Sequence, residues 1–454
     1  MAYSRTKNVI FEIKQGDDFL TSHSGLALIG ALLQRTKLEA RLNAIFLPDH
    51  PCPEISHGAI AKSMIGLLCL GKPDFTAIEP FRDDPFFQTS LQLEAVPSEG
   101  TLRQRLDDAE GKLDAILKEE SAAMIQRHAP RLRPCHQQFV PLDVDVSPFD
   151  NSGTKKEGVS WTYKKVEGYA PIFAYLGEEG YLINAQLREG SQHCQKGTPE
   201  FLRETLALAR RVTSAPLVVR MDSGNDSLDN LRVCLKEKVD WIIKRNLRQE
   251  SVEMWLEIAR RTGTVEVPRP GKTVYRGDVW VECEGFQHPF RQVFEVTVRT
   301  CEPTGQILLV PTVEVDTYET SFPDAPETIV ALYHGHGTSE QFHSEIKSDM
   351  DLERLPSGKM ATNAVVLLLG MVAYNGLRLC GQESLREEGI PVEEQAPVRY
   401  AVSRRRLRSV MQDLMYLASR LISHARRVGL SFGRGNPWYP VWRRIYVRFA
   451  DAYG

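Results

Sequence analysis

Four acidic residues have the type and the placement for binding a divalent metal ion. Asp143 and Asp145 lie two positions apart in the apolar, β-branched stretch 138–147, which predicts a strand with both side chains on one face. Asp222 ends a second such stretch, and Glu340 begins a short polar helix. Carboxylates are the ligands that Mg²⁺ prefers. Two ions about 3.5–4 Å apart would polarise a phosphodiester from both sides, so the acids predict phosphoryl transfer.

The helix that carries Glu340 has further residues suited to this chemistry. Thr338 and Gln341 match a capping box, which would place Glu340 in the first turn, where the helix dipole favours the ionised carboxylate. Lys347 follows seven residues later on the same face and could hold a phosphate. Each residue also has an ordinary explanation, as a turn residue, a helix cap or part of an exposed pair. The chemistry therefore depends on whether the acids converge.

A zinc site is the alternative raised by His334, His336 and His343, which lie in the same segment. No H-E-x-x-H motif is present, and none of the eight cysteines forms a C-x-x-C pair, so zinc is disfavoured. Scattered cysteines are typical of buried free thiols in a reducing cytoplasm. The N-terminus has no apolar run long enough for a signal peptide, which also predicts a cytoplasmic protein.

The elements that must position these residues change in character along the chain. Apolar residues recur at helical spacing between residues 20 and 135, and the segment 101–105 fits either a helix-turn-helix that reads DNA or a structural helical bundle. Residues 137–250 alternate between strands and helices, which predicts a mixed sheet with helices on its faces. From about 261 to 315 the sequence has short alternating strands and no convincing helix, which predicts a β insertion.

The C-terminal part contains an apolar helix and a basic tail. Residues 360–377 have no charged side chain, but their threonine, asparagine and glycine content favours a buried core helix over a membrane span. Residues 397–454 contain twelve arginines and two aspartates, whereas the whole chain has a formal net charge of −3. Aromatic residues are interleaved with these arginines. The pattern predicts a surface for a polyanion, with a solvated helix face as the alternative.

The segment around Glu340 resembles the Y-(2)-R-(3)-E-(6)-K signature of the DDE transposases of bacterial insertion sequences. Tyr333, His336, Glu340 and Lys347 reproduce its complete spacing, and His336 stands where the family has arginine. The stretch DLERLPSGK that follows is also typical of a subgroup. Histidine would grip a phosphate less firmly than arginine, because it makes a single contact and is charged only in part at neutral pH.

Two upstream stretches are similar to the aspartate strands of the same family. LDVDVS resembles the first, in which a serine or threonine follows the acid after one residue, and this selects Asp145 over Asp143. RMDSG resembles the second and gives Asp222. LREGSQH, at 187–193, matches between them. The resemblance covers residues 140–380 closely, and four motifs in order are far more specific than any single acid.

The resemblance implies a multidomain α/β protein with a ribonuclease-H-like mixed-sheet core. An all-β insertion would interrupt this core between Asp222 and Glu340, after a helical N-terminal domain and before a basic helical C-terminal region. The expected segments are 1–136 (helical, DNA-binding), 137–250 (first part of the catalytic core), 251–318 (β insertion), 319–385 (second part of the core, with the glutamate helix) and 386–454 (basic region).

The implied activity is cut-and-paste transposition, in which Asp145, Asp222 and Glu340 are the catalytic residues and bind Mg²⁺, with Mn²⁺ as a substitute. Water would nick the end of the element, and the freed 3′-hydroxyl would then attack a second phosphodiester. The implied partners are the double-stranded DNA of the terminal inverted repeats and of the target, and a second copy of the chain. The expected location is the bacterial cytoplasm, at the nucleoid, with no membrane partner.

Several further residues are expected to contact DNA. Tyr333, His336 and Lys347 match family positions near the cleaved phosphate. The expected contacts from the basic tail are Arg404, Arg405 and Arg406. Trp280 either stacks on a flipped base or is an ordinary buried strand tryptophan. Two other functions stay open, a metal-dependent DNA nuclease without strand transfer and a non-catalytic DNA-binding protein derived from a transposase.

Overall fold

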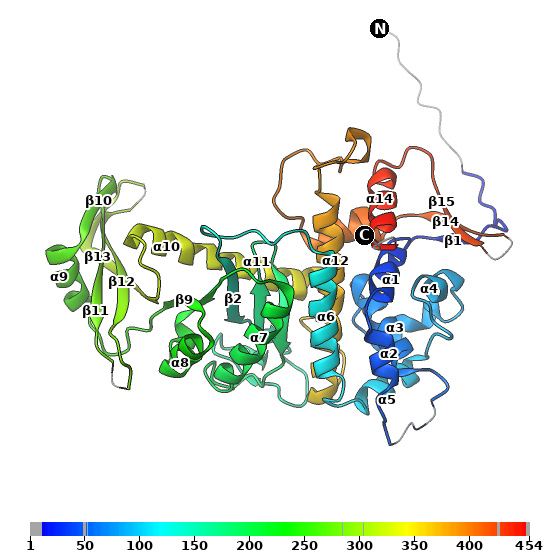
Figure 1. The fold of residues 1–454 in the computed structure, drawn as a ribbon, viewed down its shortest axis with the longest axis horizontal. Coiled ribbons are helices and arrows are strands. Elements are labelled where there is room, and N and C mark those ends of the chain that lie inside the picture. Colours follow the sequence, from blue (N-terminus) through cyan, green and yellow to red (C-terminus); the bar gives the residue numbers. More distant parts are fainter. Residues whose placement is uncertain are drawn as a thin grey trace, which may run out of the picture.

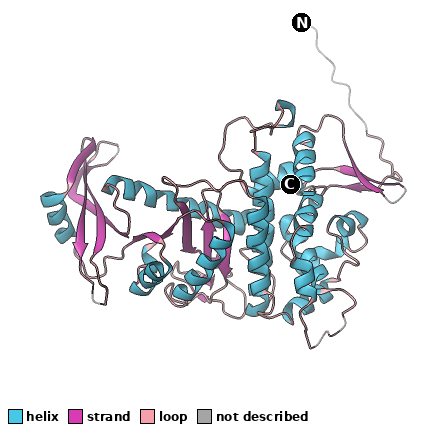
Figure 2. Ribbon diagram, viewed as in Figure 1, coloured by secondary structure: helices cyan, strands magenta, loops and turns pink. Residues whose placement is uncertain are grey.

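The structure, a computed structural model, describes residues 11–48, 51, 53–283, 285–302, 304–424 and 427–450. The molecule is elongated, and a large mixed sheet extends from one end to its middle (Figure 1). The other end consists mainly of helices, with one small sheet at its edge (Figure 2). The fold is therefore of the multidomain α/β class, as predicted.

Five strands form the core of the large sheet in the spatial order β7–β6–β2–β8–β9. β6 is antiparallel to both β7 and β2, whereas β2, β8 and β9 are parallel to one another. This order with these directions is that of a ribonuclease-H-like sheet. The strands are β2 (Val140–Val146), β6 (Ile172–Leu176), β7 (Tyr181–Gln186), β8 (Leu217–Met221) and β9 (Asp240–Lys244), and the helices α7 (Thr198–Val212) and α8 (Leu228–Glu237) lie against them.

The predicted strands of the insertion continue the same sheet. β13 pairs with β9, and the order β10–β11–β12–β13 extends the sheet to nine strands. The insertion begins with a helix that the sequence pattern did not indicate, α9 (Val252–Thr262), which packs Trp255 and Ala259 against Phe294 and Val296. The strands are β10 (Thr264–Arg269), β11 (Lys272–Val281), β12 (Phe290–Cys301) and β13 (Ile307–Thr320).

The apolar helix α12 (Met360–Ser384) is the central helix of the molecule, and the prediction of a buried core helix is confirmed. Among the described residues it alone is long and apolar enough to cross a membrane, but 94% of its most apolar window is buried inside the protein. It packs against β7 and against helices of the N-terminal part. The N-terminal helices that it contacts are α1 (Leu26–Gln34), α3 (His57–Cys69), α5 (Glu99–Asp107) and α6 (Asp114–His128), whereas α2 (Leu38–Asn43) packs against α3 and α6 and α4 (Pro85–Ser90) packs against α1.

The segment 101–105, with its two interpretations, lies in α5. Leu102 and Arg105 of this helix are buried. Arg105 Nη1 donates a hydrogen bond to the carbonyl oxygen of Ile55 at 2.8 Å, so this arginine joins α5 to the chain before α3. Arg103 pairs with Glu99 one turn earlier in α5. These contacts favour the structural bundle over a helix that reads DNA.

The C-terminal residues are built into the helical part. β14 (Ser419–His424) and β15 (Arg427–Phe432) form a hairpin that the sequence did not predict, and β14 pairs with β1 (Leu20–Thr21) near the start of the described chain. The helix α14 (Tyr439–Ala450) packs against α1 and α12. Its buried side chains are Val441, Trp442, Ile445 and Phe449. The basic tail therefore contributes to the core as well as to the surface.

Candidate active site

Asp145 and Asp222 reach the same edge of the sheet on neighbouring parallel strands. In the register of β2 and β8, Asp143 lies opposite Arg220. Asp145 comes two residues after Asp143, and Asp222 comes two residues after Arg220, so the two carboxylates lie beside each other. The carboxyl ends of parallel strands are where sites of open α/β sheets are found.

Glu340 reaches this edge on a continuous helical path. This path, which we call the glutamate helix path, consists of α10 (Pro326–His334), a 3₁₀ turn (Gly335–Thr338), α11 (Ser339–Ser344) and a π turn (Glu345–Asp349). Thr338 has helical backbone angles (φ −63°, ψ −23°), and its side chain caps no backbone amide. The predicted capping box of Thr338 and Gln341 is wrong, because the chain is already helical before Thr338.

Asp145, Asp222 and Glu340 line one cavity of about 600 Å³, which we call the active-site cavity. The acids that the sequence singled out therefore come together from two strands and a helix. Other side chains that line this cavity are Tyr163, Lys164, Tyr333, His336, His343 and Lys347. Within the described part of the chain, no three His, Cys, Asp or Glu side chains form a group ready to hold a metal ion. The acids share a cavity without forming a preassembled three-ligand site.

The electrostatics of Asp222 suit a cation site. Burial raises the pKa of its carboxyl group, and the charge of the neighbouring Asp145 raises it further. Two buried carboxylates that repel each other are stabilised by a divalent cation, whose charge dominates such a site. The acidic donors are oxygen atoms, which suit Mg²⁺ or Mn²⁺ better than zinc. The residues present fit the metal that the sequence leads us to expect.

Two histidines of the glutamate helix path bond to the two aspartates of β2. His343 Nε2 lies 3.1 Å from Asp145 Oδ2, and its Nδ1 lies 3.0 Å from the hydroxyl of Tyr175. His336 Nδ1 lies 2.8 Å from Asp143 Oδ1. Burial alone would raise the pKa of Asp145, but the hydrogen bond and charge of His343 outweigh it and leave the pKa lowered. Asp145 is therefore held ionised and in a fixed orientation.

Asp143 belongs to a buried ion cluster beneath the active-site cavity. Arg220 donates from Nε and Nη2 to its two carboxylate oxygens at 2.6 and 2.7 Å, and both side chains are only 2% exposed. Arg220 Nη1 also donates to the carbonyl oxygen of Leu332 in α10 at 2.8 Å. His336, which the sequence places at a phosphate, completes this cluster. Its Nδ1 lies within hydrogen-bond distance of Asp143 Oδ1. The cluster therefore joins the glutamate helix path to β2, which carries Asp143, and to β8, which carries Arg220.

Tyr333 and Lys347 bring a hydroxyl and an ammonium group to the active-site cavity. The ring of Tyr333 packs 4.7 Å from that of Tyr318, and burial raises the pKa of its hydroxyl. Lys347 lies in the π turn, with Nζ 5.7 Å from the centre of the Phe149 ring, and burial lowers its pKa. π turns inside helices are frequent at functional sites. Both groups therefore lie on the wall of the cavity that the three acids line.

Arg404 and Arg406 lie next to the active-site cavity. They line a second cavity of about 370 Å³, which shares Glu340 with the first. The guanidinium of Arg404 stacks 4.2 Å from the centre of the Phe342 ring. Arg406 donates to both carboxylate oxygens of Asp349 at 2.8 and 2.9 Å, yet about half of its side chain is exposed. Two of the three predicted arginines are therefore beside the acids.

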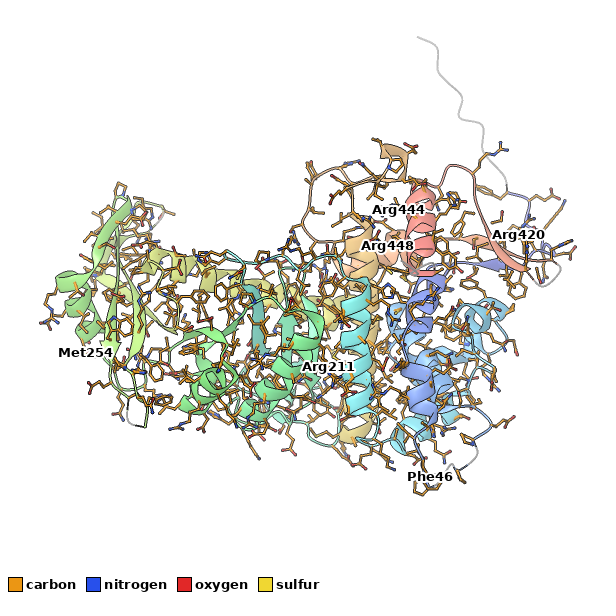
Figure 3. All side chains as sticks on the ribbon, viewed as in Figure 1. Phe46, Arg211, Met254, Arg420, Arg444 and Arg448 are labelled. Carbon is orange, nitrogen blue, oxygen red and sulfur yellow. The ribbon has the colours of Figure 1, made fainter. Side chains whose placement is uncertain are left out.

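Arg405 has a structural position, and the expectation that it contacts DNA is wrong. Its side chain is buried and pairs with Asp413. Its neighbours in sequence differ from it, because Arg404 is half-buried against Phe342 and Arg406 is exposed. Arg444 and Arg448 of α14 likewise both bind Glu383 of α12 at 2.9 Å (Figure 3). Part of the arginine content of the tail thus fixes it to the core.

Trp280 is exposed, and the expectation of a buried strand tryptophan is wrong. Its side chain on β11 is 65% exposed. It lines a cavity of about 760 Å³ together with Phe286, His288 and Arg291, the last of which lies opposite it on β12. An indole with an open face is what stacking on a base requires.

Several residues that line the active-site cavity were not predicted from the sequence, among them His343, Tyr163 and Lys164. His343 lies three residues after Glu340, a spacing that puts both on one helix face, so a signal for it was present. In the sequence His343 stands out only as a candidate zinc ligand, together with His334 and His336. Tyr163 and Lys164 belong to a short hairpin outside the motifs, and nothing in their spacing points to the acids.

Comparison with known proteins found a matching family and a similar solved structure. A family model described as the transposase DDE domain, group 1, matches residues 5–452. No curated protein matches the chain. Among solved structures, the electron cryo-microscopy structure of the piggyBac transposase synaptic complex with hairpin DNA is similar, with a TM-score of 0.39 and 11% identity over 87% of this chain and 80% of that chain. Because the family match spans nearly the whole sequence, the chain belongs to the DDE transposases, enzymes that cleave DNA and transfer its strands.

Proposed function

We propose that this transposase moves a bacterial insertion sequence by a Mg²⁺-dependent cut-and-paste reaction in the cytoplasm, with Mn²⁺ as a substitute ion. The observation that carries the proposal is that Asp145, Asp222 and Glu340, which come from three separate elements, line one cavity at the edge of a ribonuclease-H-like sheet. The raised pKa of Asp222 supports the proposal, because burial and the charge of Asp145 both disfavour the ionised carboxylate, and a divalent cation would stabilise it.

In this proposal Asp145, Asp222 and Glu340 hold the metal ions. Bound ions would polarise the scissile phosphodiester and activate the attacking water or 3′-hydroxyl. Asp145 is oriented for this role because His343 Nε2 bonds one of its oxygens and the Val146 amide donates to the other at 2.7 Å. Lys347, on the same cavity wall, neutralises part of the charge on the phosphate.

His336 acts as a positioning residue in this proposal. Its ring bonds to Asp143, which is already held by Arg220, and through that cluster the path that carries Glu340 is fixed to β2 and β8. The family arginine at this place is thereby replaced by a histidine that orients the acids. Tyr333 remains a direct contact to DNA near the cleaved phosphate, because it lines the active-site cavity.

The substrate in this proposal is double-stranded DNA, first at the terminal inverted repeats and then at the target. Arg404 and Arg406 would continue the phosphate contacts along the second cavity, and the exposed Trp280 would stack on a base extruded from the duplex. A homodimer would hold the two ends together. The segments 137–250 and 319–385 would form the catalytic core, with end recognition by 1–136, 251–318 and 386–454.

Nicking of supercoiled plasmid in Mg²⁺ tests the chemistry. Glu340→Gln keeps the size of the side chain and removes its charge, so it should abolish nicking, whereas Glu388→Gln, at an exposed glutamate after α12, should leave nicking unchanged. Strand-transfer products on DNA that carries the element's ends would then distinguish a transposase from a nuclease that only cuts. Undiminished nicking by the Glu340→Gln variant would exclude the assigned site, and an absence of nicking by the wild type would favour a non-catalytic DNA-binding protein.

A further inference from the structure

A short hairpin stands beside the active-site cavity and takes no part in the motifs of the family. It is formed by β4 (Ser160–Trp161) and β5 (Glu167–Tyr169), and β5 also pairs with β3 (Phe149–Asp150), which follows the strand of Asp145. Its tip is a tight turn in which the Thr162 amide donates to the Val166 carbonyl oxygen at 2.9 Å. The tip therefore has a defined conformation next to the first catalytic aspartate.

The hairpin is fixed to the body of the protein from two sides. The Tyr163 hydroxyl donates to the carbonyl oxygen of Val146, the residue after Asp145, at 3.1 Å. On the other side the Ser191 amide donates to Ser160 Oγ at 2.8 Å. Gly190 allows this contact, because a Cβ there would collide with the carbonyl oxygen of Ser160. The hairpin backbone and the Tyr163 ring are therefore held in place before any ligand binds.

Two of these aromatic side chains face solvent. Trp161 and Tyr163 are each 63% exposed, although large aromatic side chains are normally buried. Lys164 and Lys165 follow directly and are also exposed, and Lys164 Nζ lies 5.9 Å from the centre of the Tyr163 ring. Aromatic rings with cations at their edge are the combination that binds single-stranded nucleic acid, because each base has a face for stacking and each phosphate needs a counter-charge.

The position of the hairpin specifies the ligand further. Tyr163 and Lys164 line the same cavity as Asp145, Asp222 and Glu340. A phosphate between these acids has its neighbouring nucleotide within reach of the cavity wall. A base within a duplex is stacked on both sides and presents no free face, so an aromatic side chain at this wall can stack only on an unpaired base.

We propose that the hairpin 160–169 is a stacking and phosphate-binding platform for an unpaired nucleotide of the DNA strand that enters the active site. Trp161 and Tyr163 provide the stacking faces, and Lys164 and Lys165 bind the flanking phosphates. The proposal rests on the DNA-cleaving function proposed above and assigns to it the local form of the substrate, a strand that is opened at the cleavage point.

Binding of two synthetic DNAs in EDTA tests the platform without any cleavage. One is a fully paired duplex, and the other is a forked duplex of the same paired sequence with a short unpaired arm, both followed by fluorescence anisotropy of the full-length protein. The wild type should prefer the fork. Trp161→Ala should lose about tenfold in affinity for the fork and little for the duplex, because stacking of one base is removed. Trp161→Phe should keep most of the preference.

A matched control and a salt titration sharpen this test. Phe46→Ala removes another exposed aromatic side chain, in the loop after α2 and outside the active-site cavity, and should leave the preference for the fork unchanged (Figure 3). Replacing Lys164 and Lys165 together by alanine should reduce the slope of log affinity against log salt on the fork by about 1.4, since each single-strand phosphate contact adds about 0.7.

The outcomes separate this proposal from the one on which it rests. The platform is overturned if the wild type shows no preference for the fork. It is also overturned if Trp161→Ala retains that preference or loses affinity equally for both DNAs. A wild type that prefers the fork through Trp161 but does not nick plasmid in Mg²⁺ overturns the proposed chemistry and leaves the platform standing.

Discussion

Replacing His336 by the arginine of the family signature should damage this protein. His336 is buried, and its Nδ1 lies 2.8 Å from Asp143 Oδ1, an oxygen that already accepts a hydrogen bond from Arg220 Nε at 2.6 Å. The second oxygen of Asp143 accepts from Arg220 Nη2 at 2.7 Å. A Cβ added at Gly335 would lie 2.6 Å from Arg220 Nη1, so the guanidinium already fills the space beside the glutamate helix path.

The size of the effect follows from this geometry. His336→Arg would place a second permanent positive charge beside Arg220, where the carboxylate that His336 contacts, Asp143, is already bound on both oxygens. An uncompensated buried charge costs about 3–5 kcal/mol. For a cooperative unit of 150–250 residues, such a cost lowers the melting temperature by roughly 6–20 °C. The displaced cluster would also release the path that carries Glu340, so nicking should fall with stability.

Thermal unfolding and plasmid nicking of the wild type, His336→Arg and His336→Gln measure this effect. Glutamine is neutral and retains one hydrogen-bond donor toward Asp143, so His336→Gln should cost about 1 kcal/mol, clearly less than His336→Arg. A His336→Arg variant as stable as the wild type and more active in nicking would refute the reasoning, because it would show that position 336 contacts a phosphate.

Three further predictions concern the acids and their neighbours. Asp222→Asn should raise the melting temperature in EDTA at pH 7. Burial and the charge of Asp145 raise the folded-state pKa of Asp222, so the stability that its protonated carboxyl contributes is lost as pH rises through that pKa. The gain in melting temperature from the substitution should therefore vanish well below the unfolded-state pKa of about 3.9. His343→Phe removes the hydrogen bond to Asp145 while keeping a ring, so nicking should require about 10- to 100-fold more Mg²⁺. The maximal nicking rate should fall by a smaller factor. An unshifted Mg²⁺ titration would contradict the role assigned to His343. Arg404→Ala should lower the slope of log affinity for duplex DNA against log salt by about 0.9, and an unchanged slope would show that Arg404 meets no phosphate.

The sequence predicts the elements whose signal is local. Asp145 lies in one apolar, β-branched run and Asp222 follows another, which predicts buried strands, and the charge-free run 360–377 has the composition of a core helix. The signature spacing around Glu340 then places a third acid at the same sheet edge. The alternation of strands and helices predicts a mixed sheet, and the resemblance to the DDE transposases implies its ribonuclease-H-like order.

The features that the sequence does not reveal depend on partners that are distant along the chain. Thr338 has the letters of a cap, but α10 runs into α11 without a break, so no free amides remain to be capped. The bond of His336 to Asp143 depends on Arg220, which holds that aspartate in a buried cluster. Trp280 lies near the end of β11 and is exposed there, and β-strand periodicity alone does not say which positions of a strand are covered.

Cleavage of the protein backbone by bound iron tests most directly whether the three acids share divalent cations. Fe²⁺ loaded in place of Mg²⁺, with ascorbate and peroxide, generates hydroxyl radicals that break the chain only close to the ion. We predict breaks near Asp145, Asp222 and Glu340 together, suppressed by excess Mg²⁺ and lost in Asp145→Asn. Breaks near one of these residues alone, or at unrelated sites, would contradict the shared metal site.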